Sequence, residues 1–220
     1  MIFASFITFF TDLLDPSKLG EILDSVSPWQ YVVLFVIIFA ESGLLIGLFL
    51  PGDSLLFTAG ILASSGKLNI WILLPLSFAA AFTGDQTGYF VGSKLGTKMF
   101  SKEDAKILKK SHIEKTSVFF DKHGPKTILL ARFVPIVRTL APTMAGTAKM
   151  KYHTFISYNI FGALIWGVGV PIAGFFLGDV IGEDKIDKFL LPIIAFIIFL
   201  SFLPPLFEYI KHRKAKSSAV

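Results

Sequence analysis

Four charged side chains lie within apolar stretches of the sequence. Glu41 follows "VIIFA", Asp53 lies in "FLPGDSLLFTAG", and Arg132 and Arg138 lie in "LLARFVPIVRTLAPTMAG". Arginine stays charged and presents a planar fork of donors that suits a phosphate or a carboxylate. A carboxylate in low-dielectric surroundings can take up and release a proton. The residue types therefore predict an anion site at the two arginines beside a proton-coupling site at the two carboxylates.

These four residues also allow a purely structural interpretation. They could form two buried salt bridges, each between one of the carboxylates and one of the arginines, that only lock neighbouring segments together. Buried ion pairs are often no more stabilising than apolar packing, which favours a functional site. On an unbroken helix Arg132 and Arg138 would point about 120° apart. Pro135 removes a helix hydrogen bond between them and would let both guanidinium groups turn toward one cavity.

Other polar and aromatic residues are secondary candidates. Asp85, in "FTGDQTGYFVG", is a second potential proton carrier, but its place near the end of an apolar run slightly favours a helix-end residue that faces water. Trp71, Tyr89 and Trp166 are interpreted as interface or packing aromatics rather than ligand contacts. The chain has no cysteine, and its four histidines are scattered without ligand spacing. We therefore expect no metal and no cofactor. The sequence also shows no nucleophile elbow, phosphate-binding glycine loop or metalloprotease motif, so we expect no enzymatic activity.

The elements that must position these charges are membrane helices. Of the 220 residues, 53% are hydrophobic and only 17% are charged, whereas an average soluble domain has roughly 25% charged residues. A membrane-spanning helix needs about 20 apolar residues. Runs near this length occupy residues 30–50, 70–93, 155–178 and 189–210, with a shorter broken run at 127–148. The composition predicts an all-α, polytopic membrane protein.

The charged residues fall in two broken segments, residues 39–60 and 129–146. Irregular backbone at membrane depth is tolerated only where protein or a watery cavity covers it. We therefore expect two re-entrant hairpins whose tips meet. Their helix breakers are Pro51 and Gly52 in the first segment and Pro135 and Pro142 in the second.

The sequence also contains an internal repeat at an offset of 86 residues. At this offset Gly60 matches Gly146, and "GYFVGSKLG" at 88–96 matches "GFFLGDVIG" at 174–182. The bland alternative is that small residues recur in all packed membrane helices. The repeat predicts a core domain over residues 29–182 with two copies, about 30–96 and 127–182.

Charge asymmetry predicts the orientation of the two copies. Nine lysines lie in residues 94–126, of which 97–126 join the copies, and the C-terminal tail is basic as well. Both segments should be cytoplasmic by the positive-inside rule, and membrane anchoring explains them better than nucleic-acid binding. The acidic connector that follows the second copy should lie outside. The copies are therefore expected to be inverted, an arrangement typical of alternating-access transporters.

The two ends of the chain complete the predicted organisation. Residues 1–28 are read as a retained amphipathic, interfacial segment, although packing against the bundle is an equally good interpretation. Residues 183–220 are read as the acidic connector, a last membrane helix and a basic cytoplasmic tail.

As a set, "FAESG", "FLPGDSLLFTAG", "GDQTGYFVGSKLG" and "ARFVPIVRTLAPTMAG" resemble the DedA family of bacterial inner-membrane proteins, which is related to the SNARE-associated, VTT-domain lipid scramblases. The resemblance implies two opposed re-entrant hairpins. It also implies an important acidic pair, Glu41 and Asp53, and an arginine pair, Arg132 and Arg138. It further implies transport that depends on the proton motive force, and family members have been linked to returning undecaprenyl phosphate across the membrane.

These observations give a first functional hypothesis and three alternatives. The first is a proton-coupled flippase in which the arginines bind the phosphate of a polyprenyl phosphate and the carboxylates exchange protons. The alternatives are a proton-coupled exporter of small cations or drugs, a lipid scramblase, and a structural membrane protein whose charged core is only a latch. Membrane lipids and protons are the expected partners, and the sequence is compatible with a homo-oligomer.

Overall fold

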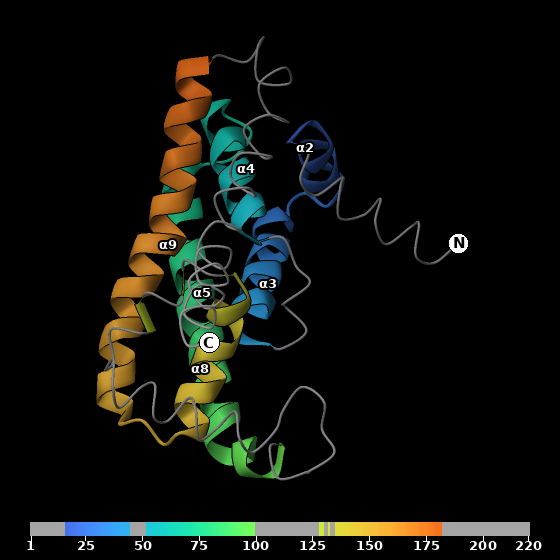
Figure 1. The fold of residues 1–220 in the computed structure, drawn as a ribbon. Helices are drawn as coiled ribbons and strands as arrows, with labels where there is room; N and C mark the ends of the chain where they lie inside the picture. Colours follow the sequence, from blue (N-terminus) through green and yellow to red (C-terminus); the bar gives the residue numbers. More distant parts are fainter. Residues whose placement is uncertain (1–15, 45–51, 100–127, 130–131, 133–134, 182–220) are drawn as a thin grey trace, which may run out of the picture.

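The computed structural model describes residues 16–44, 52–99, 128–129, 132 and 135–181 (Figure 1). These residues contain no β-strand, which confirms the predicted all-α class. The described helices are α2 (Pro16–Ser25), α3 (Gln30–Gly43), α4 (Gly52–Ser64), α5 (Ile70–Met99), α8 (Pro135–Thr147) and α9 (Tyr152–Ile181). The predicted last span at 189–210 and most of the basic segment 97–126 lie outside the described residues.

Among the described helices, α9 is the one that is both long and apolar enough to cross a membrane. It contains the predicted run 155–178. Helices α2 and α3 qualify together if they are taken as one span, but the chain bends by 116° between Lys18–Ser25 and Gln30–Gly43. Helix α5 contains the run 70–93 and is as long as α9. Helix α3 covers the first part of the run 30–50 and ends at Gly43, and residues 45–50 lie outside the described residues.

Four of these helices form two consecutive pairs along the chain, α4 with α5 and α8 with α9, and each pair is a 13-residue helix followed by a 30-residue helix. Within the bundle, α4 packs against α9 and α8 packs against α5, so each short helix contacts the long helix of the other pair. Helices α5 and α9 are antiparallel (Figure 1). Helices α4 and α8 both begin near the middle of the molecule and run toward opposite ends.

Glycines allow these helices to touch backbone to backbone. A Cβ on Gly60 of α4 would overlap the carbonyl oxygen of Pro171 in α9. In the same way, a Cβ on Gly146 of α8 would overlap the carbonyl oxygen of Tyr89 in α5. Small residues permit such close approach in membrane helix bundles. The two glycines matched by the 86-residue offset therefore have the same role: each lets a short helix approach the backbone of a long one.

A valine at Gly146 is expected to destabilise the bundle. The added side chain would have to push α8 away from α5, and overpacking of this kind costs about 1–3 kcal/mol or more. Gly169 of α9 provides the matched control, because a Cβ there meets no atom within 4 Å. We expect Gly146→Val to lower the thermal unfolding midpoint of the detergent-purified protein, and Gly169→Val to leave it nearly unchanged. Equal midpoints for the two variants would contradict the close helix contact.

The N-terminal helix α2 is amphipathic and packs on the bundle. Leu19 and Leu23 are buried in the main hydrophobic cluster, which also contains Leu62 of α4. Glu21 and Asp24 are exposed on the other face. Of the two interpretations for residues 1–28, packing against the bundle therefore holds for Pro16–Ser25, and residues 1–15 lie outside the described residues.

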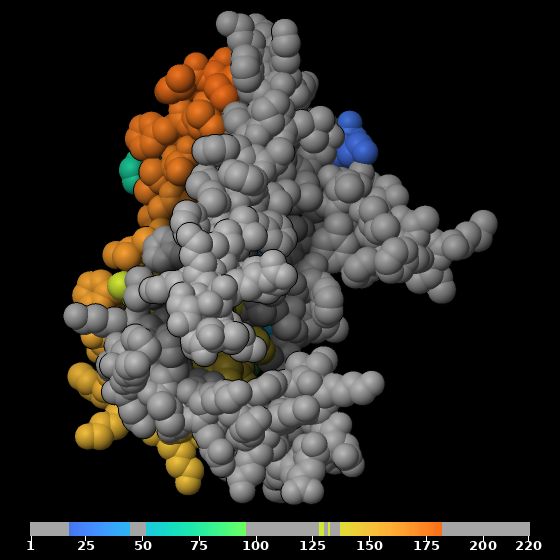
Figure 2. All heavy atoms as spheres, in the orientation of Figure 1, coloured from blue at the N-terminus to red at the C-terminus, as the bar shows by residue number. Residues whose placement is uncertain are grey.

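The outer side of α9 exposes large apolar side chains along one edge of the molecule (Figure 2). Phe161, Phe176 and Val180 are among the most exposed hydrophobic residues of the described chain. Several large exposed apolar side chains along one helix mark contact with another apolar phase. In a membrane protein, this face fits the hydrocarbon of the bilayer, while the opposite face of α9 is turned to the charged residues.

Candidate functional site

Arg138, near the start of α8, holds both members of the predicted acidic pair. Its Nη1 donates a hydrogen bond of 2.5 Å to Oδ1 of Asp53, and its Nη2 forms an ion pair with Oε1 of Glu41. The side chains of Arg138 and Glu41 are 2% and 4% exposed, whereas that of Asp53 is 29% exposed. One arginine therefore joins α3, α4 and α8, and Asp53 is the member of the triad that a ligand can reach.

The local sequence places each member of this triad at a helix end. Pro135 begins α8, where its missing N–H and fixed φ are tolerated, and Arg138 follows in the first turn. Asp53 lies in the first turn of α4, and Glu41 lies near the C-terminal end of α3. The helix dipole favours an anion at an N-terminus and a cation at a C-terminus. It therefore favours Asp53 but disfavours both Glu41 and Arg138, whose mutual pairing offsets this cost.

Arg132 lies just before α8 and has different partners. Its Nη2 forms an ion pair with Oδ2 of Asp85 in α5 and donates a 2.6 Å hydrogen bond to Oδ1 of Asn159 in α9. The side chain of Asp85 is only 2% exposed. The interpretation of Asp85 as a helix-end residue that faces water is therefore wrong. It lies within the bundle because α3, α8 and α9 all pack against α5.

The acidic pair and the arginine pair do not form the two one-to-one salt bridges that the sequence allowed. Glu41 and Asp53 both bind Arg138, and neither is paired with Arg132, which binds Asp85 instead. The structure brings all the predicted charged residues into the same part of the bundle, but it divides them into two centres. We name these the Arg138 centre (Glu41, Asp53, Arg138) and the Arg132 centre (Asp85, Arg132, Asn159).

The predicted helix breakers have different outcomes. Gly52 is the first residue of α4, and a Cβ there would overlap Oε2 of Glu41, so the absence of a side chain leaves room for that carboxylate. Pro135 begins α8. Pro142 lies inside α8 and does not interrupt it, so its interpretation as a hairpin breaker is wrong. Pro51 lies outside the described residues.

Trp166 contacts the Arg138 centre, although the sequence suggested only an interface or packing role. Its Nε1 donates a 2.5 Å hydrogen bond to Oδ1 of Asp53. Its ring lies under the guanidinium of Arg138, with Cζ 4.3 Å from the ring centroid, which is a cation–π contact. Trp71 and Tyr89 are not part of the site: Trp71 is exposed, and Tyr89 donates to the carbonyl oxygen of Met150.

Sequence reasoning also missed Asn159. This residue is fully buried, and its Nδ2 donates a 3.2 Å hydrogen bond to the carbonyl oxygen of Phe82. A signal was present, because an amide inside the apolar run "FISYNIFGALIW" has to find a partner in a membrane helix. For Trp166 no comparable signal exists, since its contacts depend on which face of α9 is buried.

The two centres retain capacity to bind a polar ligand. Several of their buried side-chain atoms have no hydrogen-bond partner among the described residues, and such atoms are uncommon in native interiors. They include both donors and acceptors, so a group that carries oxygen atoms or protons could pair with them. These atoms are Oε2 of Glu41, Oδ1 of Asp85, Nε and Nη1 of Arg132, and Nε of Arg138.

Comparison with known proteins identifies the family. Residues 50–176 match the VTT domain. The chain is 44% identical to Protein DedA of Escherichia coli over 203 residues, which cover 91% of each chain. It is 41% identical to an uncharacterized membrane protein of Mycobacterium tuberculosis over 219 residues, 97% of this chain and 93% of that protein. It is also 34% identical to the inner membrane protein YqjA of Escherichia coli over 169 residues, 77% of this chain and 73% of that protein. No solved structure matches the chain. With most of its described core inside the VTT domain and its similarity to DedA running over nearly its whole length, this chain is a membrane protein of the DedA family.

Proposed function

We propose that this protein is a transporter of the bacterial inner membrane, driven by the proton motive force, that flips a polyprenyl phosphate from one leaflet to the other. Undecaprenyl phosphate is the substrate that the family resemblance favours. The observation that carries the proposal is the Arg138 centre. In it, the guanidinium of a buried arginine forms ion pairs with a buried carboxylate and with a partly exposed one.

The surroundings of Arg138 suit a phosphate. Arginine binds phosphate through two parallel charge-assisted hydrogen bonds. The first turns of α4 and α8 meet at this point, since they supply Asp53 and Arg138 to one ion pair. Helix N-termini attract anions through their free N–H groups and their dipoles. A phosphate at this position would therefore be stabilised by the guanidinium and by two helix ends together.

Asp53 is the group that the phosphate would displace. It is the most exposed member of the Arg138 centre, so a headgroup can approach it first. In our proposal Asp53 takes up a proton, releases Nη1 of Arg138 and leaves this donor to the phosphate. Glu41 stays against Arg138 on the buried side until the opposite half-cycle. The polyprenyl chain remains in lipid, beside the apolar outer side of the helices.

The transport cycle requires the two helix pairs to be inverted relative to the membrane. Three features support this topology: the antiparallel α5 and α9, the opposite directions of α4 and α8 (Figure 1), and the lysine-rich segment between the pairs. We propose that this segment and the C-terminus lie in the cytoplasm, by the positive-inside rule. The two helix pairs would then alternate in opening the site to either side of the membrane.

The direct test uses purified protein in liposomes with an imposed pH gradient and a fluorescently labelled undecaprenyl phosphate. We expect protein-dependent flipping that accelerates when the gradient is applied and returns to the gradient-free rate when a protonophore collapses it. A control with the labelled polyprenol, which lacks the phosphate, should not be flipped. Absence of flipping by folded protein would overturn the proposal, and equal flipping with and without the gradient would indicate a scramblase.

One observation favours a second candidate, a proton-coupled exporter of small cations. The two centres contain three carboxylates against two arginines, so with all groups ionised they carry one excess negative charge. Such a site could hold a monovalent cation beside Asp53. The same liposomes discriminate the two candidates, because an exporter predicts that soluble cations, and not the lipid, accelerate proton flux.

A further inference from the structure

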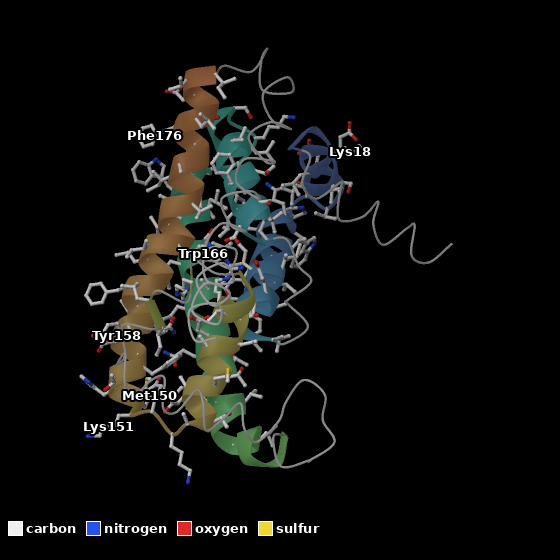
Figure 3. All side chains as sticks on the ribbon, viewed as in Figure 1. Lys18, Met150, Lys151, Tyr158, Trp166 and Phe176 are labelled. Atoms are coloured by element: carbon white, nitrogen blue, oxygen red, sulfur yellow. The ribbon has the colours of Figure 1, made fainter. Side chains whose placement is uncertain are left out.

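One face of α9 contacts both arginines of the site. Asn159, Gly162 and Trp166 are three and four residues apart, and side chains at this spacing lie on the same side of a helix. Trp166 lies toward the middle of the bundle, whereas Phe176 points away from it (Figure 3). The three residues lie beside the charged centres. Their contacts include hydrogen bonds and a cation–π contact, which apolar packing does not require.

Asn159 fixes one end of Arg132. Its Oδ1 accepts the 2.6 Å hydrogen bond from Nη2 of Arg132, while its Nδ2 donates to the carbonyl oxygen of Phe82 in α5. Both ends of the amide are therefore used, and the bond to Phe82 sets the direction in which the oxygen points. An apolar residue of similar size would fill the same volume. The amide is therefore needed for its hydrogen bond to the guanidinium of Arg132 and not for packing.

Gly162 leaves the space on the surface of α9 that the side chain of Arg132 occupies. A Cβ at this position would overlap Nε of Arg132 and would lie 2.6 Å from its Cδ. The arginine side chain therefore runs across the bare backbone of α9. Because Nε and Nη1 have no partner among the described residues, the position of this side chain is set mainly by Asp85, by Asn159 and by the space at Gly162.

Trp166 touches two members of the Arg138 centre at once. Its N–H and Nη1 of Arg138 both donate to the same oxygen, Oδ1 of Asp53, each at 2.5 Å. Its ring supports the guanidinium from below. If Asp53 leaves Arg138 when a phosphate arrives, the indole N–H must lose this acceptor or move with it. Trp166 is therefore coupled to the exchange step itself.

We propose that Asn159, Gly162 and Trp166 form a positioning face on α9 that holds both arginines, and that Trp166 responds directly to the exchange of Asp53 for substrate on Arg138. The second part rests on the proposed function. The first part concerns contacts of the resting protein and can be tested without transport.

Fluorescence of Trp166 provides that test. The chain contains three tryptophans, and Trp29 and Trp71 are exposed, so the variant Trp29→Phe/Trp71→Phe leaves Trp166 as the sole reporter. In this background we expect Asp53→Asn and Arg138→Lys each to shift the emission spectrum of the folded protein. We also expect geranyl phosphate to shift it, and geraniol, which lacks the phosphate, to leave it unchanged.

The outcomes separate the two parts of the inference. Identical spectra for the parent and for Asp53→Asn, with both proteins folded, would overturn the positioning role of Trp166. A spectrum that responds to Asp53→Asn but not to geranyl phosphate would support the positioning face and count against phosphate as the ligand. Flipping in the liposome assay, measured independently, reports on the proposed function.

Transport measurements test the Arg132 side of the face. We expect Gly162→Ala to reduce the maximal flipping rate about tenfold, the effect of losing one hydrogen bond to a charged group, with a smaller change in the lipid concentration at half-maximal rate. Gly169→Ala on the same helix is the matched control and should flip at the parental rate. Conversion of Asn159 to Asp should retain more activity than conversion to Leu, since Asp preserves the acceptor. Parental rates for both Gly162→Ala and Asn159→Leu would overturn this side of the proposal.

Discussion

Arg138→Lys is expected to reduce flipping by at least tenfold while the protein stays folded. Lysine keeps the positive charge but offers one compact ammonium in place of a rigid fork. It cannot hold Glu41 and Asp53 from two separate nitrogens as Arg138 does, and it cannot bind a phosphate with two parallel hydrogen bonds. One charge-assisted hydrogen bond is worth about 1.5–3 kcal/mol, and about 1.4 kcal/mol corresponds to a factor of ten in rate. The measurement is the initial flipping rate in liposomes, beside the thermal unfolding midpoint of each variant.

Lys151→Arg provides the control for the change of residue type, because Lys151 is exposed just before α9 and lies away from the site (Figure 3). It should flip at the parental rate. If Arg138→Lys also flips at the parental rate, two-pronged phosphate binding at this position is wrong.

A variant in which the whole Arg138 centre is neutral distinguishes a transport site from a centre that only latches the helices together. Arg138→Met alone leaves Glu41 and Asp53 without their cation, and breaking a buried ion pair costs about 3–5 kcal/mol. The triple variant Glu41→Gln/Asp53→Asn/Arg138→Met removes the unpaired charges and should regain most of the lost stability. A latch predicts that the triple variant also regains function. Our proposal predicts a stable protein that does not flip the lipid.

The charged residues could be found from the sequence because of where they occur. Glu41 and Arg138 stand out since a charge inside an apolar segment is costly and needs a partner. The matched glycines Gly60 and Gly146 could be found as well, because their spacing repeats. Residue type and spacing along the chain are sufficient for inferences of this kind.

The pairing of the charges could not be found in the same way. Whether Arg132 or Arg138 meets a given carboxylate depends on how α8 lies against α3, α4 and α5, which the sequence does not specify locally. Asp85 was misjudged because its distance from the end of an apolar run says nothing about the helices that cover it. Trp166 was missed because its ring reaches Arg138 only through tertiary packing, in which α4 and α5 lie against α9 and α8 lies against α5.

Pro142 illustrates a different limit of the sequence argument. Proline in a helix interior removes one hydrogen bond and usually bends or breaks the helix. In membrane proteins, neighbouring helices and side chains can satisfy the freed groups. Pro142 is buried where α8 crosses α5, beside Gly88, so tertiary packing supports the helix through it. Pro135, at the first position of α8, meets no such conflict, and its effect was easier to anticipate.

The second large effect is expected at Asp85. Asp85→Leu removes the only carboxylate that the described residues pair with Arg132, and leaves Asn159 as the remaining partner of this guanidinium. An arginine buried without its anion should destabilise the protein by about 3–5 kcal/mol. We expect a clear fall in the thermal unfolding midpoint and in the yield of monodisperse protein. Asp179 of α9 is the matched control, because it lies on the exposed side of α9, so that Asp179→Leu should leave the midpoint nearly unchanged.

The double variant Asp85→Leu/Arg132→Met then decides what the Arg132 centre does. Replacing a buried ion pair by apolar residues of similar volume is often neutral or stabilising, so the double variant should unfold close to the parental midpoint. If Arg132 and Asp85 only hold α5 against the start of α8, this protein should flip lipid at the parental rate. If Arg132 supplies part of the phosphate site, as the sequence predicts, the rate should stay at least tenfold lower, since one charge-assisted contact to the phosphate is lost. A stable double variant with full activity would restrict the phosphate site to Arg138 and assign the Arg132 centre to the architecture of the bundle.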